Sequence, residues 1–309
     1  MKPDRRRMRT RIAAAVVALM LGAAAAVFAQ RDLSEVEIRA DKLAGGVYVL
    51  FGAGGNMGLS VGPDGALLVD DQFAELSPRI LAAIKSVSDQ PVRFLVNTHW
   101  HGDHAGGNEN MAKAGALIIA HDNVRRRLAE GMYNELFESK MDASPAVALP
   151  VITFNDSTTF HVNGDDVVVF HVAPAHTDGD AIVWFKRANV VHMGDTFFNG
   201  MYPVVDYPSG GNIDGMIAAC DRVLPLLAAD TQVIPGHGKM ATREDLRAYR
   251  DMLVGIRSAV AKLVKQGGNL AQVQAAKPTA KWDEKWGGGF IKPDIITKVI
   301  YINLSGKRL

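Results

Sequence analysis

Residues 97–104 read Asn97-Thr98-His99-Trp100-His101-Gly102-Asp103-His104, which places four potential metal ligands within six residues. They directly follow an apolar run that is typical of a β-strand. In an extended chain His99 and His101 point to the same side, because side chains alternate across a strand. Asp103 and His104 come where glycines allow the chain to turn, so they can face a second point nearby. Imidazole and carboxylate together suit zinc, and iron or manganese also accept them.

Strands and helices alternate on both sides of this segment. Strands are expected at residues 47–51, 57–61, 66–71, 92–97, 116–120, 165–172, 181–185 and 190–193. Helices are expected at residues 76–87, 124–137, 213–227 and 246–263, the last with Thr242 as its N-cap. This alternation indicates an α/β architecture in which helices pack on the faces of sheets. No repeat, low-complexity tract or long linker follows Gln30, so residues 30–309 are expected to form a single domain.

The first 29 residues have the pattern of a secretory signal peptide. A basic start is followed by an apolar, alanine-rich run at residues 12–28, and cleavage is expected after Ala29. A retained membrane anchor is the alternative, although a run of about 17 residues is at the short limit for a spanning helix. The sequence therefore predicts a periplasmic or secreted protein without membrane contact after cleavage.

Composition excludes several classes of protein. The chain has 309 residues, of which 48% are hydrophobic and 22% charged, so it can form a large core and is neither disordered nor fibrous. Cys220 is the only cysteine, which excludes an intramolecular disulfide, and its place on an apolar helix face predicts a buried side chain. Beyond residue 29 there are 28 basic and 32 acidic residues, a balance that gives no reason to expect nucleic-acid binding. A small-molecule substrate is expected, and the oligomeric state stays open.

The His-x-His-x-Asp-His pattern after a strand resembles the signature of the metallo-β-lactamase-fold superfamily. Later ligand positions of that superfamily find matches in the same order, at His176, at Asp195 after Gly194 and at His237 between two glycines. Asp70 resembles the first acidic motif of the superfamily, which supports the site and binds no metal. The resemblance covers roughly residues 45–240. It implies an α/β fold of four layers, αββα, in a single domain.

The resemblance also implies a site for two divalent metal ions, with zinc favoured and iron or manganese as alternatives. The first ion would be held by His99, His101 and His176, and the second by Asp103, His104 and His237. Asp195 would bridge the two ions, together with a water or hydroxide. Asp103 is in addition expected to act in catalysis. Two cations about 3.5–4 Å apart lower the pKa of a shared water, so that no serine or cysteine nucleophile is needed.

The remaining polar and aromatic candidates are expected to have structural roles. This group comprises His121, His161, His171 and His192, the packing residue Trp100, and Asp178 and Asp180, which can at most support a ligand histidine. The stripe at 246–263 is expected to form core or an oligomer contact, and residues 282–290 a packed closing loop. The turn at residues 52–57 lacks a following Gly-Lys-Ser/Thr and is therefore no phosphate loop. It is expected to be a plain turn, and the alternative is a mobile flap beside the site whose Asn56 and Met57 touch substrate.

The resemblance implies a hydrolase, and the fold alone leaves its substrate open. The first hypothesis is an exported enzyme in which a metal-bridging hydroxide attacks the carbonyl of a small cyclic amide or ester. A β-lactam is the named candidate, with weak turnover, because one β-lactamase subclass has a cysteine where this chain has Asp195. A glyoxalase II-type thioesterase or lactonase and an iron-dependent sulfur dioxygenase-like oxidoreductase are the alternatives. A metal-stabilised binding protein without turnover is a third reading.

Overall fold

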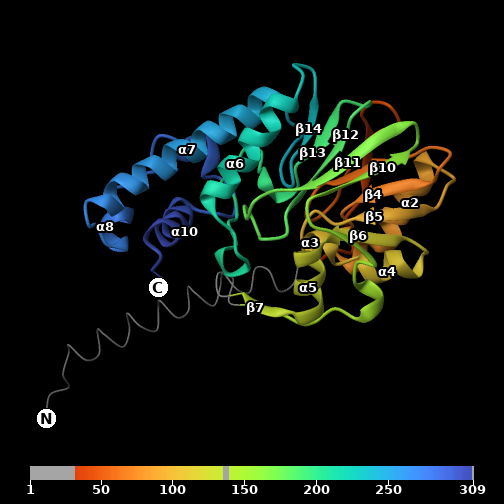
Figure 1. Cartoon of the computed structure of the whole chain (residues 1–309), viewed down its shortest axis with the longest axis horizontal. Helices are drawn as coiled ribbons and strands as arrows, with labels where there is room; N and C mark the ends of the chain where they lie inside the picture. The colour runs from red at the N-terminus through yellow and green to blue at the C-terminus, as the bar shows by residue number, and fades with distance from the viewer. Residues whose placement is uncertain (1–31, 135–138, 308–309) are drawn as a thin grey trace, which may run out of the picture.

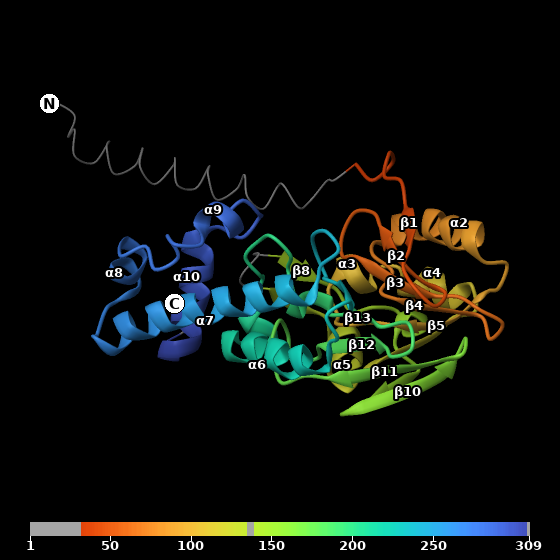
Figure 2. The same cartoon turned by 90° about the horizontal axis from the view of Figure 1, so that it is seen from above.

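The computed structural model describes residues 32–134 and 139–307. Two β-sheets lie face to face, and helices cover the outer face of each (Figures 1 and 2). This is the expected four-layer αββα arrangement. The predicted signal peptide, residues 1–29, lies outside the described residues. Within the described part of the chain, no helix combines the length and apolar character needed to cross a bilayer.

The first sheet has seven strands in the order β1-β2-β3-β4-β5-β6-β9. Their bounds are Arg39–Lys42, Val47–Phe51, Met57–Ser60, Ala66–Val69, Val92–Val96, Leu117–His121 and Ile152–Phe154. The pairings from β1 to β4 are antiparallel, and those from β4 to β9 are parallel. Because β4 and β5 are parallel neighbours, their carboxyl ends meet at one edge of the sheet. Asp70 and the His99–His104 segment therefore come together.

The second sheet has five strands in the order β10-β11-β12-β13-β14. Their bounds are Ser157–Val162, Asp165–His171, Ala181–Phe185, Val190–His192 and Gln232–Ile234. Only β13 and β14 pair in parallel, so that Asp195 and His237, which follow them, lie at the same edge. A separate hairpin is formed by β7 (Met132–Asn134) and β8 (Ser139–Met141).

Three apolar layers hold the fold together. Alternate residues of each sheet, among them Leu67, Val69 and Val183, fill the space between the sheets. The opposite face of the first sheet packs against α2 (Ser77–Val87) and α4 (Asn108–Lys113). The opposite face of the second sheet packs against α6 (Ile213–Val223) and α7 (Arg243–Lys265).

The C-terminal helices extend the outer layer on the second sheet. Thr242 caps α7 in a capping box with Asp245, as predicted, and the stripe at 246–263 lies in the core. Cys220 is buried in the same core, as expected. Beyond α7, the helices α8 (Leu270–Ala275), α9 (Asp283–Trp286) and α10 (Pro293–Ser305) pack beside α6 and α7 (Figure 2). They share one core with the second sheet, so the described chain is a single domain.

Two predicted helices end earlier than expected. The helix predicted at 124–137 is α5 (Asp122–Glu130), because Gly131 has a φ of 62° and leads into β7; residues 135–137 lie outside the described residues. The helix predicted at 213–227 ends at Val223 and continues as a short 3₁₀ turn that contains Pro225, which cannot donate a helical hydrogen bond. The segment 282–290, predicted as a loop, includes the short helix α9.

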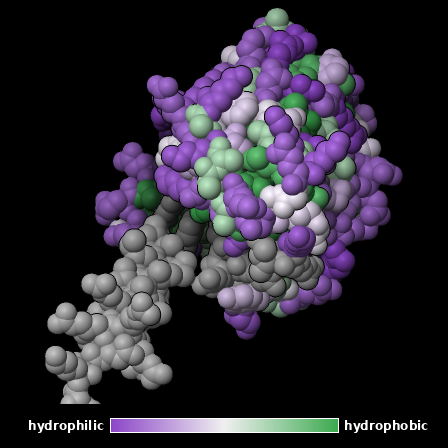
Figure 3. All heavy atoms as spheres, turned by 90° about the vertical axis from the view of Figure 1, so that its left-hand side faces the viewer, coloured by the Kyte–Doolittle hydropathy of each residue, from purple (hydrophilic) through white to green (hydrophobic). Residues whose placement is uncertain are grey.

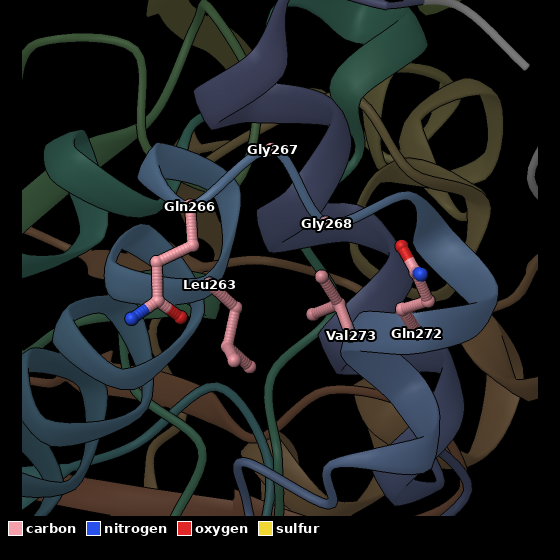
Figure 4. Close-up of a pocket in the computed structure, with 6 residues that line it drawn as sticks. All are labelled: Leu263, Gln266, Gly267, Gly268, Gln272 and Val273. Atoms are coloured by element: carbon pink, nitrogen blue, oxygen red, sulfur yellow. The ribbon is translucent and has the colours of Figure 1, made fainter.

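The end of the molecule formed by the C-terminal helices has a mainly hydrophilic surface with smaller hydrophobic areas (Figure 3). A shallow hollow of about 280 Å³ lies between the end of α7 and α8 (Figure 4). It is lined by Leu263, Gln266, Gly267, Gly268, Gln272 and Val273, none of which is ionisable. The hollow therefore offers no catalytic or metal-binding group.

Candidate metal centre

The seven predicted ligand residues gather where four strands end. The His99–His104 segment follows β5 and runs into the short helix α3 (Gly102–Ala105), His176 follows β11, Asp195 follows β13 and His237 follows β14. Their side chains form three groups, within each of which the ligand atoms lie no more than 4.8 Å apart. The groups are His99, His101 and His176; His99, His104 and Asp195; and Asp103, His104 and His237. The two predicted histidine sets are thus adjacent.

Asp195 lies between these two sets. Its Oδ1 is 3.1 Å from Nε2 of His104, and its Oδ2 is 3.4 Å from Nε2 of His237 and 3.5 Å from Nε2 of His176. Gly236 makes room for this carboxylate, since a Cβ there would come within 2.0 Å of Oδ1. A single carboxylate therefore reaches both sets, the position expected of a bridging ligand.

Asp70 orients two of the histidines, His104 directly and His99 through the Thr98 hydroxyl. Its Oδ2 lies 2.8 Å from Nδ1 of His104 and accepts a hydrogen bond of 2.7 Å from the Thr98 hydroxyl. The same hydroxyl lies 3.1 Å from Nδ1 of His99. Each ring thereby keeps its Nε2 free for the centre, as the partners of metal-bound histidines commonly arrange. Asp70 supports the site as the sequence analysis expected.

The other ligand rings are also fixed by protein groups. His176 has its Nδ1 2.8 Å from the carbonyl oxygen of Val204, and Asp180 accepts hydrogen bonds from the backbone N–H groups of His176 and Thr177. His101 presents Nδ1 to the centre, because its Nε2 lies 2.9 Å from Oδ2 of Asp206. Sequence reasoning missed Asp206, which belongs to no recognisable motif and follows no strand.

The electrostatics of the cluster suit metal ligands. Burial lowers the pKa of His99 well below its usual value and that of His176 to about 4, so both rings are neutral at neutral pH. Burial alone would raise the pKa of Asp195, but the charges of His237 and His104 outweigh it and hold that pKa well below its usual range. His99, His176 and Asp195 are thus in the forms that bind metal, neutral imidazole and ionised carboxylate. The charge of Asp195 outweighs burial and raises the pKa of His104 and of His237, so these two rings would release a proton when a cation binds.

Within the described part of the chain, two buried atoms of the cluster make no hydrogen bond, although one of them, Oδ1 of Asp195, lies close to the His104 ring. Among the described residues, Nε2 of His99 and Oδ1 of Asp195 make no hydrogen bond although both are buried. An unpaired buried polar atom is costly, and a cation between these atoms satisfies both. Five imidazoles and two carboxylates are a donor set that zinc, iron and manganese accept. The residues present therefore fit a divalent metal centre.

The remaining histidines and acids lie outside the cluster. His121 and His171 stack on each other, His161 is exposed beside Asp166, and His192 is buried with its Nε2 2.9 Å from the carbonyl oxygen of Asn56. Asp178 forms an ion pair with Arg127. Trp100 is buried, as expected.

The glycine-rich loop at 52–57 is anchored, and the idea that Asn56 and Met57 touch substrate is wrong. Met57 is completely buried in the core beneath the first sheet. The Asn56 amide donates to the carbonyl oxygens of Pro235 and Gly238. Gly55 packs directly on the His104 ring, since a Cβ there would lie 2.1 Å from its Cε1. The loop thus holds His104 in place.

Family membership follows from comparison with known proteins. A model of the metallo-beta-lactamase superfamily matches residues 51–259, more than half of the chain, so the protein belongs to this superfamily. The solved structure of a metallo-beta-lactamase from Pontibacter korlensis superposes with a TM-score of 0.60, covering 71% of this chain and 99% of that one at 20% identity. At this identity the likeness shows the fold alone.

Several relatives in sequence are hydrolases by name. A hydroxyacylglutathione hydrolase of Rhodospirillum rubrum is 30% identical over 178 residues, which make up 55% of this chain and 56% of that protein. A probable metallo-hydrolase of Bacillus subtilis is 28% identical over 188 residues, covering 56% of this chain and 82% of that protein. The protein is accordingly a member of the metallo-beta-lactamase superfamily, whose members are generally hydrolases, and it has glyoxalase II-like relatives.

Proposed function

We propose that the protein is a two-metal hydrolase that cleaves the acyl C–O or C–N bond of a small ester or amide. His99, His101 and His176 would hold the first ion, Asp103, His104 and His237 the second, and Asp195 both. The position of Asp195 carries this proposal, because its two oxygens reach histidines of both sets.

Two divalent cations, proposed to be zinc, would supply Lewis-acid activation of a water and of the substrate carbonyl. Residues of the chain itself would orient the attacking water. Asp103 has a side chain that is 29% exposed, whereas Asp195 is buried, so Asp103 faces the side from which substrate and water arrive. The charges of His104 and His237 outweigh burial and keep the pKa of Asp103 below its usual value. Its ionised carboxylate can therefore orient the attacking water by accepting a hydrogen bond.

For the substrate we propose a small cyclic amide or ester, with a β-lactam as first candidate. The expected signal peptide supports this choice, because an exported enzyme meets β-lactams and lactones outside the cytoplasm. A thioester is the second candidate, and the hydroxyacylglutathione hydrolase of Rhodospirillum rubrum favours it.

The test is metal analysis combined with three assays on residues 30–309. Mass spectrometry should find about two zinc ions per chain, and the same preparation should hydrolyse a chromogenic β-lactam, a lactone or a thioester. Chelation should abolish turnover and added zinc should restore it. Iron as the main metal without hydrolysis would overturn the proposal in favour of a sulfur dioxygenase-like oxidoreductase. Bound zinc without any turnover would leave a binding protein.

We further propose export with cleavage after Ala29. Expression of the full chain in a bacterium with a periplasm should yield a periplasmic protein whose first residue is Gln30. An uncut chain in the membrane fraction would show a retained anchor instead.

A further inference from the structure

Phe290 is an exposed aromatic residue beside the metal centre. Its ring centroid lies 6.0 Å from that of His237 and meets it edge-on. The buried ring of Phe198 stacks on His237 at 5.2 Å with an interplanar angle of 12°, and its centroid lies 6.2 Å from that of Phe290. Phe290 is 41% exposed, whereas Phe198 is fully buried. The centre is therefore bordered on the His237 side by an apolar ring that solvent can reach.

The segment that carries Phe290 is fixed on both sides. Trp286 and Ile291 are buried in the core that the C-terminal helices share with the second sheet. The N–H of Tyr202 donates to the carbonyl oxygen of Trp286 at 2.9 Å. Gly289 lies against Met201, where a Cβ would come within 2.6 Å. Phe290 is thus presented by an anchored turn, which keeps its position relative to His237.

Phenylalanine side chains are most often buried. Here the next residue, Ile291, is buried, whereas the Phe290 ring stays open to solvent. The His237 side chain beneath it is itself 15% exposed. A molecule that reaches the cluster over His237 therefore also contacts Phe290.

We propose that Phe290 is a specificity-determining residue that packs against an apolar group of the substrate. The substrate class is an acyl compound, ester, thioester or amide, that carries an aromatic ring or branched alkyl chain beside its carbonyl. This inference rests on the proposed function for turnover, but binding to the metal-loaded protein tests it separately. Phe290 lies beyond residues 51–259, the part of the chain that the superfamily model matches. The apolar flank is therefore supplied by the C-terminal region of this chain.

The test compares two thiols that bind zinc through sulfur, mercaptoacetate and 2-mercapto-3-phenylpropanoate. Calorimetry gives the dissociation constant of each for the zinc-loaded wild type, Phe290→Ala and Phe290→Leu. The phenyl thiol should bind the wild type about tenfold more tightly than mercaptoacetate, because its ring is covered by Phe290. Phe290→Ala should lose this advantage, Phe290→Leu should keep part of it, and mercaptoacetate should bind all three proteins equally. Ile295→Ala is the matched control, since Ile295 is an exposed apolar residue of α10 and should leave both constants unchanged.

An unchanged ratio of the two dissociation constants in Phe290→Ala, with the zinc content of the wild type, would overturn the proposal. Equal weakening of both thiols with lost zinc would indicate damage to the centre, and Phe290→Leu then gives the deciding ratio. Zinc content and melting temperature of each variant identify such damage independently. Hydrolysis is measured on the same proteins with an acetyl and a phenylacetyl thioester. If the thiol ratios change as expected but no carbonyl compound is cleaved, the proposed function fails while the role of Phe290 stands.

Discussion

Oδ2 of Asp206 lies 2.9 Å from Nε2 of His101, although 105 positions separate the two residues in the chain. This contact decides which nitrogen of His101 faces the metal centre, because it engages Nε2 and leaves Nδ1 2.8 Å from Nε2 of His176. Asp206 is itself completely buried and accepts a hydrogen bond from the Ser209 hydroxyl. The ring orientation of a metal ligand thus depends on a loop that contributes no ligand.

Replacing Asp206 with alanine should weaken the first metal site. The Nε2–H group of His101 would lose its buried acceptor and the ring its fixed orientation. Loss of such a partner lowers metal affinity by about 10–100-fold. Competition with a chromogenic zinc chelator measures the affinity, and Asp206→Asn, which keeps an oxygen acceptor, should recover part of it. Asp221→Ala is the control, because Asp221 pairs with Arg250 at the surface; wild-type affinity in Asp206→Ala would contradict the assigned role.

Asp195→Ala should reduce the number of bound metal ions. The substitution removes the carboxylate that reaches both histidine sets and leaves buried histidines without their negative partner. After passage over a chelating resin, the variant should retain at most about half of the wild-type zinc, since both sites lose a ligand. Metal analysis of Asp178→Asn provides the comparison, because Asp178 lies in the neighbouring loop but pairs with Arg127. Equal zinc in Asp195→Ala and the wild type would exclude a bridging position.

Gly55→Ala should destabilise the protein through His104. A Cβ on residue 55 would lie 2.1 Å from Cε1 of His104, and hydrogen bonds to Asp103 and Gln72 prevent the loop from moving away. Overpacking of this kind costs about 1–3 kcal/mol. Thermal unfolding should show a melting temperature lower by roughly 2–4 °C for each kcal/mol. At Gly288 a Cβ meets no atom within 4 Å, so Gly288→Ala should melt like the wild type.

Much of this centre could be predicted from sequence because several ligands lie within one short segment that directly follows a predicted strand. The His99–His104 segment concentrates ligands in a few residues, and parallel strands bring the segments that follow them to one edge. Each long buried strand also has the apolar pattern that predicts it. His176, Asp195 and His237 could be placed in the same site because their surroundings resemble the later ligand positions of the superfamily.

The parts that sequence reasoning missed depend on contacts between distant segments. Asp206 and Phe290 acquire their positions from tertiary packing, and neither has a pattern in its own neighbourhood that indicates a role. Short strands such as β9 and β14, three residues each, are too brief to show a period of two. The alternative in which Met57 touches substrate is wrong because Met57 begins β3, in agreement with the strand predicted at 57–61, and that strand buries its side chain.

The stack of His121 on His171 should make folding sensitive to acid. The two rings end β6 and β11 and lie 3.8 Å apart at an interplanar angle of 16°. Burial lowers the pKa of both, and for His121 the neighbouring His171 lowers the pKa further. The unfolded chain therefore takes up protons first, at about pH 6.5. The free energy of unfolding contributed by the neutral pair is fully present above that pH. It is lost as the pH falls from there through the lower pKa values that the two rings have in the folded state.

His171→Phe tests this pair, because phenylalanine keeps a ring for stacking but has no titrating nitrogen. Melting temperatures are recorded from about pH 7.5 down to about pH 5, on either side of the ordinary histidine pKa. The variant should lose less stability on acidification than the wild type, because one of the two proton-binding groups is absent from its unfolded chain. Parallel curves for His171→Phe and the wild type would show that the stacked pair contributes nothing to the pH dependence.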